Sequence, residues 1–317
     1  MAKRILFIGP TGSGKSTLIN ALFNNDIKKE SLSKPAVAND TSSGVTSTFT
    51  TYYDFPSYAY TDSIGFGDNR FDHNQIFRSL KCVIKQSMVG YNRIYLCLRY
   101  GRMSNYIRYY IEFLTAVFDQ GILDYCTLVF THCKDKSMTT QLYLEKNKDD
   151  QDMCGIINKV HNVVFGDNNV DDDEEVDKIL LVRRENFLGQ IKADINESNE
   201  QYYIPRPTDF IEWITRINYI FKKLILNSTS LFRLGAATVH AITHGEIKSL
   251  AKFFETENCV KYEEYYGECP ICLDSMWSKD ATITKCHHVF HQQCLLQLLT
   301  PICPICRENI NLSEEKK

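Results

Sequence analysis

Eight cysteine and histidine side chains near the C-terminus have the types and the spacing of zinc ligands. Two C-x-x-C pairs flank a C-x-H-x-x-H-x-x-C core, formed by Cys269, Cys272, Cys286, His288, His291, Cys294, Cys303 and Cys306. Thiolates and imidazoles in groups of four satisfy tetrahedral Zn²⁺, and a site closed by four protein ligands is structural. The eight ligands therefore predict two zinc ions, which supply most of the folding free energy of a segment of about 40 residues.

A second group of residues, at the other end of the chain, has the composition of a phosphate-binding loop. The stretch GPTGSGKST matches G-x-x-x-x-G-K-[ST], follows an apolar strand candidate and precedes the helix candidate LINALF. In this motif backbone N–H groups surround the phosphates, the lysine contacts the β and γ oxygens, and the following hydroxyl binds Mg²⁺. The residues expected to do so are Gly9, Thr11, Gly12, Ser13, Gly14, Lys15, Ser16 and Thr17.

The next polar stretches predict how the γ-phosphate is sensed. In YAYTDSIGFGD, Asp62 is expected to reach Mg²⁺ through water, and the amide of Gly65 is expected to contact the γ-phosphate. Thr46 is the expected switch threonine that joins the Mg²⁺ shell when the γ-phosphate is present, and Thr48 is the alternative. Phe66 stands where small signalling GTPases have a water-orienting glutamine, so intrinsic hydrolysis is expected to be slow.

A carboxylate after a later strand candidate favours guanine over adenine. The stretch YCTLVFTHCKD ends at Asp135, whose oxygens can accept hydrogen bonds from both N1–H and N2–H₂ of guanine. In the usual G-protein motif an Asn-Lys pair precedes this aspartate, and here His132 and Cys133 take those places. The sequence therefore favours GTP with Mg²⁺ as the ligand.

Several of these stretches together resemble the immune-associated GTPases, also called the AIG-type or GIMAP family. The stretches are GPTGSGKSTLINALF, GVTST, DSIGFGD, LCLRYGRM and VFTHCKD, and the resemblance covers roughly residues 1–225. It implies nucleotide-dependent homodimers whose active sites face each other. It also implies that a next strand, KILLVRRENF, places Glu185 and Asn186 in the last guanine-contacting loop. Arg102 is the candidate for an arginine supplied across the dimer, and the alternative is a solvated surface residue.

Residues 269–307 resemble the RING finger of the two-histidine kind. The two zinc sites interleave in that family, so the resemblance assigns Cys269, Cys272, His291 and Cys294 to one ion and Cys286, His288, Cys303 and Cys306 to the other. His287 falls outside the spacing, although a one-residue change of register would let it replace His288. Phe290 is expected to pack between the two sites.

RING domains mostly serve as ubiquitin ligases that hold a charged ubiquitin-conjugating enzyme and its substrate together. By motif, Ile271 and Pro304 would line the groove for the conjugating enzyme, and Leu298 stands where a tryptophan commonly contributes. Arg307 falls where active members place a cation that contacts both the conjugating enzyme and ubiquitin. The resemblance thus implies E3 ubiquitin transferase activity, with a charged conjugating enzyme and an unidentified protein substrate as partners.

Composition limits the other functions that the chain could have. Of 317 residues, 44% are hydrophobic and 24% charged, and the formal net charge of −3 leaves no basic surplus for nucleic acid or anionic lipid. Arg233 and His240 interrupt the best apolar run, so no transmembrane segment is expected. The first strand candidate begins at Lys3, which leaves no room for a signal peptide, and a cytoplasmic protein is expected.

An α/β P-loop GTPase domain with a mostly parallel sheet is expected over residues 1–225, where its strands and helices would position the nucleotide-binding residues. A helical connector is expected over 226–264, a small cross-brace RING with bound zinc over 265–310 and a disordered tail over 311–317. The interpretation is a ubiquitin ligase controlled by GTP. Two alternatives are a GTPase whose RING is only an oligomerising scaffold, and a nucleotide-binding platform that recruits substrate without turnover.

Overall fold

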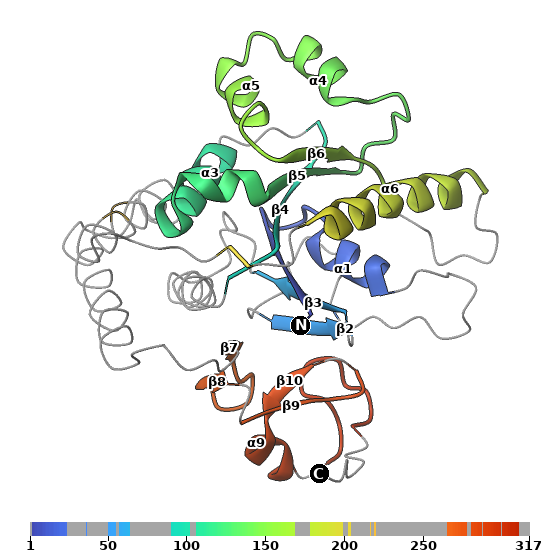
Figure 1. Cartoon of the computed structure of the whole chain (residues 1–317). Helices are drawn as coiled ribbons and strands as arrows, with labels where there is room; N and C mark the ends of the chain where they lie inside the picture. Colours follow the sequence, from blue (N-terminus) through green and yellow to red (C-terminus); the bar gives the residue numbers. More distant parts are fainter. Residues whose placement is uncertain are drawn as a thin grey trace, which may run out of the picture.

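The structure is a computed structural model of the chain. It describes residues 2–23, 36, 50–54, 57–63, 90–101, 106–168, 178–198, 202–203, 216, 219, 265–277, 280–286, 288–298 and 300–310. The N-terminal part contains β1 (Lys3–Ile8), α1 (Lys15–Phe23), β2 (Thr50–Asp54), β3 (Tyr58–Asp62), β4 (Arg93–Arg99), α3 (Tyr106–Phe118), η1 (Gln120–Tyr125), β5 (Cys126–Thr131), α4 (Thr140–Lys146), α5 (Gln151–Ile157), β6 (Asn162–Phe165) and α6 (Lys178–Glu197). Figure 1 labels most of these elements. The C-terminal part contains β7 (Tyr265–Glu268), β8 (Ser275–Trp277), β9 (Ala281–Ile283), β10 (Val289–His291) and α9 (Gln292–Leu296).

The described strands of the N-terminal part form one sheet in the order β2-β3-β1-β4-β5-β6. Strands β3, β1, β4, β5 and β6 are parallel, and β2 at the edge is antiparallel to β3. The central strands are continuous apolar runs because helices cover both faces of the sheet, as in α/β proteins. This arrangement confirms the predicted α/β fold with a mostly parallel sheet.

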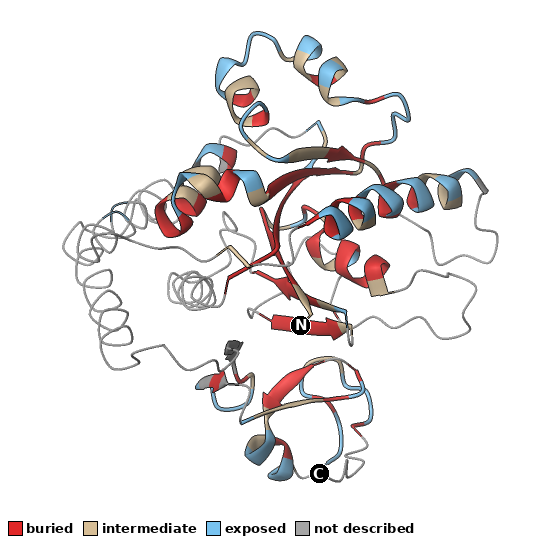
Figure 2. Ribbon diagram, in the orientation of Figure 1, coloured by how far each residue is buried: buried red, intermediate tan, exposed pale blue. Residues whose placement is uncertain are grey.

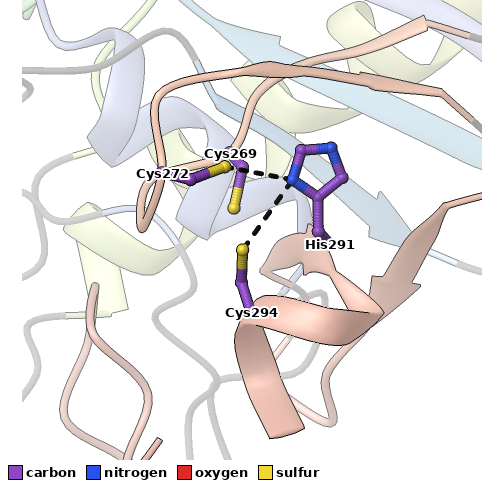
Figure 3. A group of neighbouring side chains, drawn as sticks. All are labelled: Cys269, Cys272, His291 and Cys294. Atoms are coloured by element: carbon purple, nitrogen blue, oxygen red, sulfur yellow. Dashed lines mark hydrogen bonds between the residues drawn. The ribbon is translucent and has the colours of Figure 1, made fainter. Parts of the chain in front are cut away.

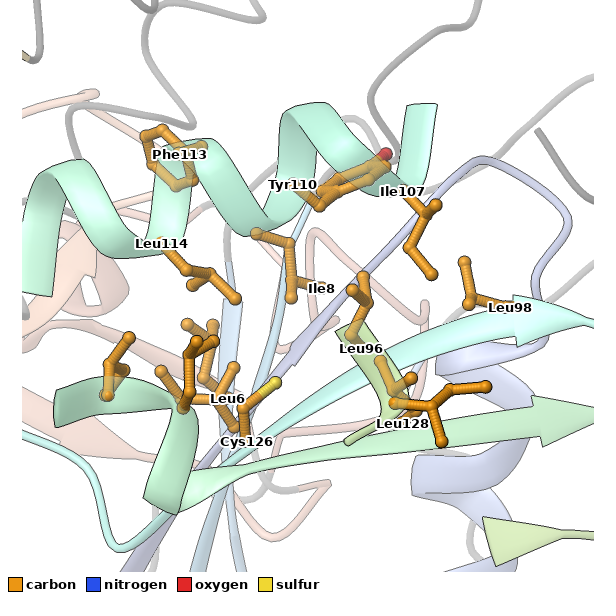
Figure 4. Close-up of a cluster of buried hydrophobic side chains, with 14 of the residues drawn as sticks. Leu6, Ile8, Leu96, Leu98, Ile107, Tyr110, Phe113, Leu114, Cys126 and Leu128 are labelled. Carbon is orange, nitrogen blue, oxygen red and sulfur yellow. The ribbon is translucent and has the colours of Figure 1, made fainter. Parts of the chain in front are cut away.

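Two hydrophobic clusters lie on opposite faces of the sheet. Figure 4 shows the first, in which Tyr110, Phe113 and Leu114 of α3 pack over Leu6 of β1 and Leu96 of β4. The second joins the other face to α1 and α6 through a set of buried side chains that includes Phe7, Leu18, Ile19, Phe187, Leu188, Ile191 and Ile195. Figure 2 shows the central strands of the sheet buried, whereas α6 is exposed on its outer side. Because β3, β1, β4, β5 and β6 run in the same direction, their carboxyl ends lie at one edge of the sheet. Open α/β sheets bind their ligands at this edge.

One predicted strand is wrong, since the segment KILLVRRENF lies within the helix α6. The apolar run at its start, which contains Ile179 and Val182, is half exposed and does not enter the sheet. The buried residues Phe187, Ile191 and Ile195 recur at helical spacing instead and place one face of α6 on the sheet. A short apolar run does not distinguish a strand from a helix, and here the spacing after the run decides.

A buried carboxylate fastens the C-terminal turns of α6 to the sheet. Asp194 accepts hydrogen bonds from the hydroxyls of Tyr95 (2.9 Å) and Thr127 (3.0 Å) and from the amide of Asn162 (3.0 Å). Nε of Arg93 lies 3.3 Å from Oδ2 of Asp194, and Nε2 of His161 lies 3.6 Å from its Oδ1. Because the hydrogen-bond donors come from β4, β5 and β6, the helix is fixed across three neighbouring strands.

The C-terminal part is a small unit of short hairpins. Strand β7 pairs with β8 and β9 pairs with β10, both antiparallel, and α9 follows β10 directly. Phe290 is fully buried among the zinc-ligand candidates, as predicted. The predicted connector over 226–264 and the predicted tail over 311–317 lie outside the described residues. Among the described residues, no helix has the length and apolar character needed to cross a membrane.

Candidate nucleotide and zinc sites

The phosphate-loop residues lie between β1 and α1, at the carboxyl edge of the sheet. Gly9 has a φ of +151°, and a Cβ built there would lie 2.2 Å from the carbonyl oxygen of Cys97, so only glycine fits. The ammonium of Lys15 donates to the carbonyl oxygens of Gly9 and Pro10, both at 3.0 Å. Burial lowers the pKa of Lys15, and the nearby charge of Asp62 opposes this effect. The loop therefore holds the buried ammonium of Lys15 beside a tight bend of the backbone, and this combination is typical of a phosphate-binding site.

The two side chains that are predicted to bind Mg²⁺, directly or through water, contact each other. The hydroxyl of Ser16, on the first turn of α1, donates to Oδ2 of Asp62 at the end of β3, over 2.6 Å. Among the described residues, Oδ1 of Asp62 has no hydrogen-bond partner although it is buried. Burial raises the pKa of Asp62 to about 6, and the charge of Lys15 and the Ser16 bond partly oppose this rise. A hydroxyl beside a carboxylate with a free buried oxygen fits Mg²⁺, which prefers oxygen ligands.

The end of β5 connects the phosphate loop to the predicted base-binding residues. The hydroxyl of Thr131 lies 2.8 Å from the carbonyl oxygen of Ser13 and 3.2 Å from that of Leu98. His132 follows with a φ of +56°, which turns the chain away from the strand. Thr131 thus positions the phosphate loop against the start of the guanine motif, a role that the sequence alone did not indicate.

Asp135 lies on an exposed loop after β5. Its Oδ1 accepts from the hydroxyl and the backbone N–H of Ser137, at 2.6 and 3.0 Å, and Lys146 lies 3.8 Å from Oδ2. The Ser137 hydroxyl lowers the pKa of Asp135, with its backbone N–H and Lys146 adding to the effect. The carboxylate is therefore held ionised in an accessible place, as an acceptor for a base requires.

The prediction for the last base-contacting loop is wrong, because Asn186 lies on the exposed side of α6 and not in a loop. The strand after β5 is β6, and residues 166–168 follow it. The backbone N–H of Cys133 donates to the carbonyl oxygen of Gly166 at 3.0 Å, which brings this loop beside the guanine motif. Asn168 is buried there, and its Nδ2 has no partner within the described part of the chain. The stretch VVFGDNN has the pattern of a short apolar strand followed by a turn, and this pattern predicts the loop that contains Asn168.

Several predicted residues lie outside the described part of the chain. They are Thr46, Thr48, Gly65, Phe66, Arg102 and His287.

The eight zinc-ligand candidates converge into two groups of four. One group is Cys269, Cys272, His291 and Cys294, the other is Cys286, His288, Cys303 and Cys306, and within each the ligand atoms lie within 4.8 Å of one another. Figure 3 shows the first group, in which Nδ1 of His291 lies 3.2 Å from Sγ of Cys272 and 3.9 Å from Sγ of Cys294. In the second group Nδ1 of His288 lies 3.4 and 3.5 Å from two sulfurs.

These spacings suit a tetrahedral ion in each group. With Zn–S of about 2.3 Å and Zn–N of about 2.0 Å, the sulfur–nitrogen edge of a tetrahedron is about 3.5 Å. Each group also takes two ligands from an N-terminal pair and two from a later one, so the groups interleave along the chain. The donor set and its geometry fit zinc in both places.

The groove residues predicted around the zinc groups differ in exposure. Ile271 is 36% exposed and Pro304 is exposed, whereas Leu298 is half-buried against the hydrophobic cluster of the RING. Arg307 is exposed with a φ of +64°, and its backbone N–H donates to the carbonyl oxygen of Cys303 at 2.9 Å. The loop that holds the last zinc ligands therefore also fixes the position of Arg307.

Comparison with known proteins gives a local match for the C-terminal part. The family model described as a ring finger domain matches residues 267–307. RING-H2 finger protein ATL30 of Arabidopsis thaliana is 42% identical over 55 residues, which are 16% of this chain and 19% of that protein. The chain thus spans about a fifth of the length of this curated relative.

Two solved structures similar to the chain are a Toc33 structure and an elongation factor. Toc33 from Arabidopsis thaliana in complex with GDP and Mg²⁺ is 14% identical, with 64% of this chain and 86% of that chain covered and a TM-score of 0.43. The bacterial selenocysteine-specific elongation factor EF-Sec is 17% identical, with 62% and 29% covered and a TM-score of 0.35. The AIG1 family model matches residues 3–209, more than half of the sequence. The chain therefore belongs to the AIG1 family.

Proposed function

We propose that the protein binds GTP and uses its RING to transfer ubiquitin from a charged conjugating enzyme to a substrate lysine, under the control of bound nucleotide. The observation that carries the proposal is the RING surface. Both ligand groups are assembled, while Ile271, Pro304 and Arg307 remain exposed around them. A RING that holds a partner enzyme needs such an open apolar and cationic face, because its catalysis consists of positioning.

In this proposal each zinc group holds one ion, so the chain binds two. Zinc supplies folding free energy to a unit too small for an adequate apolar core, and it takes no part in the transfer. Ile271, Pro304 and Leu298 contact the conjugating enzyme. Arg307 donates hydrogen bonds to the conjugating enzyme and ubiquitin together and so holds the thioester ready for attack by the substrate lysine.

The nucleotide is held by the chain as follows. Lys15 contacts the β- and γ-phosphates, Ser16 and Asp62 serve Mg²⁺, and Asp135 accepts from the guanine edge. Asn168 supplies the second polar contact to the base, because its buried Nδ2 has no partner among the described residues and lies in the loop beside the guanine motif. Guanine offers the carbonyl oxygen O6 to such a donor, whereas adenine offers an amino group there.

The proposal includes an architecture and a location. A GTPase domain over 1–225 is followed by a connector over 226–264 and the RING over 265–310. Nucleotide-dependent homodimers form through the GTPase domain, with Arg102 supplied across the interface to speed a slow hydrolysis. None of the described cysteines forms a disulfide, which suits a cytoplasmic protein.

A second function has one observation in its favour. Leu298, at the place where a large aromatic side chain commonly enters the groove, is half-buried in the hydrophobic cluster of the RING. A groove with less apolar area binds a conjugating enzyme more weakly, and a RING with a weak groove would act as a scaffold for oligomers of the GTPase.

Reconstitution separates the two functions. Purified chain, ubiquitin, activating enzyme and a set of conjugating enzymes should give ubiquitin chains, and Ile271→Ala should abolish them. Ile179→Ala is the matched control, because Ile179 is equally an exposed isoleucine but lies on α6, away from the RING. Absence of transfer with every conjugating enzyme, while both zinc ions are bound, would favour the scaffold.

A further inference from the structure

The edge strand of the GTPase sheet is covered by the RING. Strand β2 ends the sheet at one side, yet Thr50, Thr51, Tyr52 and Tyr53 are all buried. Strands β7 and β10 pack against β2, and Figure 1 shows the C-terminal hairpins beside β2 and β3. An unpaired edge strand usually needs such protection. The RING provides it here from within the same chain.

The contact is apolar and specific in its partners. Tyr53 and its cross-strand partner Ala59 belong to one hydrophobic cluster with the RING residues Cys269, Met276, Cys286, Val289, Phe290, Leu295, Cys303 and Ile310. On the neighbouring position of β2, the ring of Tyr52 meets the imidazole of His288 at 5.3 Å between centroids and an angle of 76°. This is the edge-to-face arrangement that aromatic rings prefer. A zinc-ligand candidate of the second group therefore touches the GTPase domain directly.

The same strand reaches the candidate Mg²⁺ site. Thr50, at the start of β2, is the register partner of Asp62, and the hydroxyls of Thr51 and Thr61 lie 3.0 Å apart. Strand β2 is thus a continuous connection between Asp62 and the RING.

Docking leaves the outer face of the RING open. Ile271, Leu273 and Leu296 are 36%, 50% and 63% exposed while the RING lies against β2. The contact therefore does not cover the face proposed for the conjugating enzyme. Its effect is to fix where that face points relative to the GTPase domain.

We propose that β2 couples the two sites, so that GTP with Mg²⁺ tightens the docking of the RING on Tyr52 and Tyr53, and the docked RING in turn favours GTP over GDP. Mg²⁺ held between the γ-phosphate and Asp62 orders the start of β2, because Thr50 is the register partner of Asp62. Coupling between two binding equilibria is reciprocal, so the RING must then act on nucleotide affinity.

This inference rests on the proposed function for the identity of the nucleotide, but it needs neither ubiquitin transfer nor a dimer. Because the contact lies within one chain, the coupling does not depend on protein concentration. That property separates it from control through dimerisation.

Hydrogen–deuterium exchange on the full zinc-loaded chain tests the docking. With a non-hydrolysable GTP analogue, amides of β2 and of β10 should both exchange more slowly than with GDP, by about tenfold and equally at low and high protein concentration. Equal exchange of β10 in the two nucleotide states would overturn the inference.

A pair of variants tests the reciprocal effect. Tyr53→Ser removes the apolar packing of Tyr53 against the RING and should lower the ratio of GTP-analogue to GDP affinity about tenfold, equivalent to about 1.4 kcal/mol. Tyr58→Ser is the control, since Tyr58 lies on the same hairpin but packs against the cluster on the α1 side. Tyr53→Phe should keep the ratio.

The readouts identify which proposal fails. A wild-type ratio in folded Tyr53→Ser protein would overturn the coupling, and if that variant does not fold, the exchange experiment decides. Nucleotide coupling in a chain that never transfers ubiquitin would support the inference and count against the ligase alone. A chain that binds no guanine nucleotide would overturn both.

Discussion

Replacing Asp62 by asparagine should stabilise the nucleotide-free chain at neutral pH and abolish its response to Mg²⁺. The carboxylate is fully buried, accepts one hydrogen bond from Ser16 and has a second oxygen without a partner among the described residues. Asparagine has the same shape and keeps an oxygen for the Ser16 hydroxyl, but it cannot ionise. The substitution therefore isolates the cost of a buried charge that only a cation can offset.

The size of the effect follows from the pKa of Asp62, which burial raises from 3.8 to about 6. A raised folded-state pKa means that the folded chain binds this proton more tightly than the unfolded chain does. The stability it contributes is present below about pH 4 and is lost as the pH rises through about 6. Since each pKa unit corresponds to about 1.4 kcal/mol, Asp62→Asn should match the wild type near pH 4 and exceed it by about 3 kcal/mol above pH 7.

Urea unfolding followed by circular dichroism, at pH values from about 4 to about 7.5, measures this difference. The RING is identical in both proteins, so its own pH dependence cancels when the two curves are subtracted. With a GTP analogue, Mg²⁺ should strengthen binding to the wild type and leave Asp62→Asn unchanged. Between about pH 7.5 and 5.5 the ionised fraction of Asp62, and with it the Mg²⁺ effect, should fall about fourfold. Parallel stability curves, or a full Mg²⁺ effect in the variant, would refute the reasoning.

Three further predictions concern the zinc groups, the base and the phosphate loop. Metal analysis should find two zinc ions, and His291→Ala should lose zinc while His287→Ala keeps both; one zinc in the wild type would contradict the two groups. Asp135→Asn and Asn168→Ala should each weaken GTP more than ATP in competition assays, and a wild-type preference for ATP would contradict the guanine site. Gly9→Ala should cost about 2–4 kcal/mol in thermal unfolding and abolish nucleotide binding, because its methyl group would collide with a backbone oxygen; unchanged binding would count against the loop geometry.

The features that the sequence predicted best are those in which local spacing determines the geometry. The ligand spacing of Cys269 to Cys306 allows two closed groups of four, and the structure assembles these groups. The phosphate-loop glycines predict a bend that no other residue permits at Gly9. Apolar runs such as KRILFI predict buried parallel strands because both faces of the sheet are covered.

The errors and omissions concern tertiary packing. The run ILLV before Arg183 has the pattern of a strand, but Phe187 and the residues after it pack on the sheet as part of a helix. Asn186 therefore lies on this helix and not in a loop. The sequence does not predict a base-binding role for the loop at Asn168, because the strand before it, β6, is only four residues long. The contact of Tyr53 with the RING joins segments more than 200 residues apart, and no local pattern in a sequence encodes such a pairing.

Ubiquitin transfer by the purified chain, measured with a GTP analogue, with GDP and without nucleotide, tests the central claim most directly. The account predicts transfer by the zinc-loaded wild type that is fastest with the analogue. It also predicts that Arg307→Ala removes transfer in all three states without changing zinc content or nucleotide affinity, because Arg307 is exposed and follows the last ligand. Transfer at one rate in all three states would contradict nucleotide control, and transfer that survives Arg307→Ala would contradict the proposed role of the RING surface.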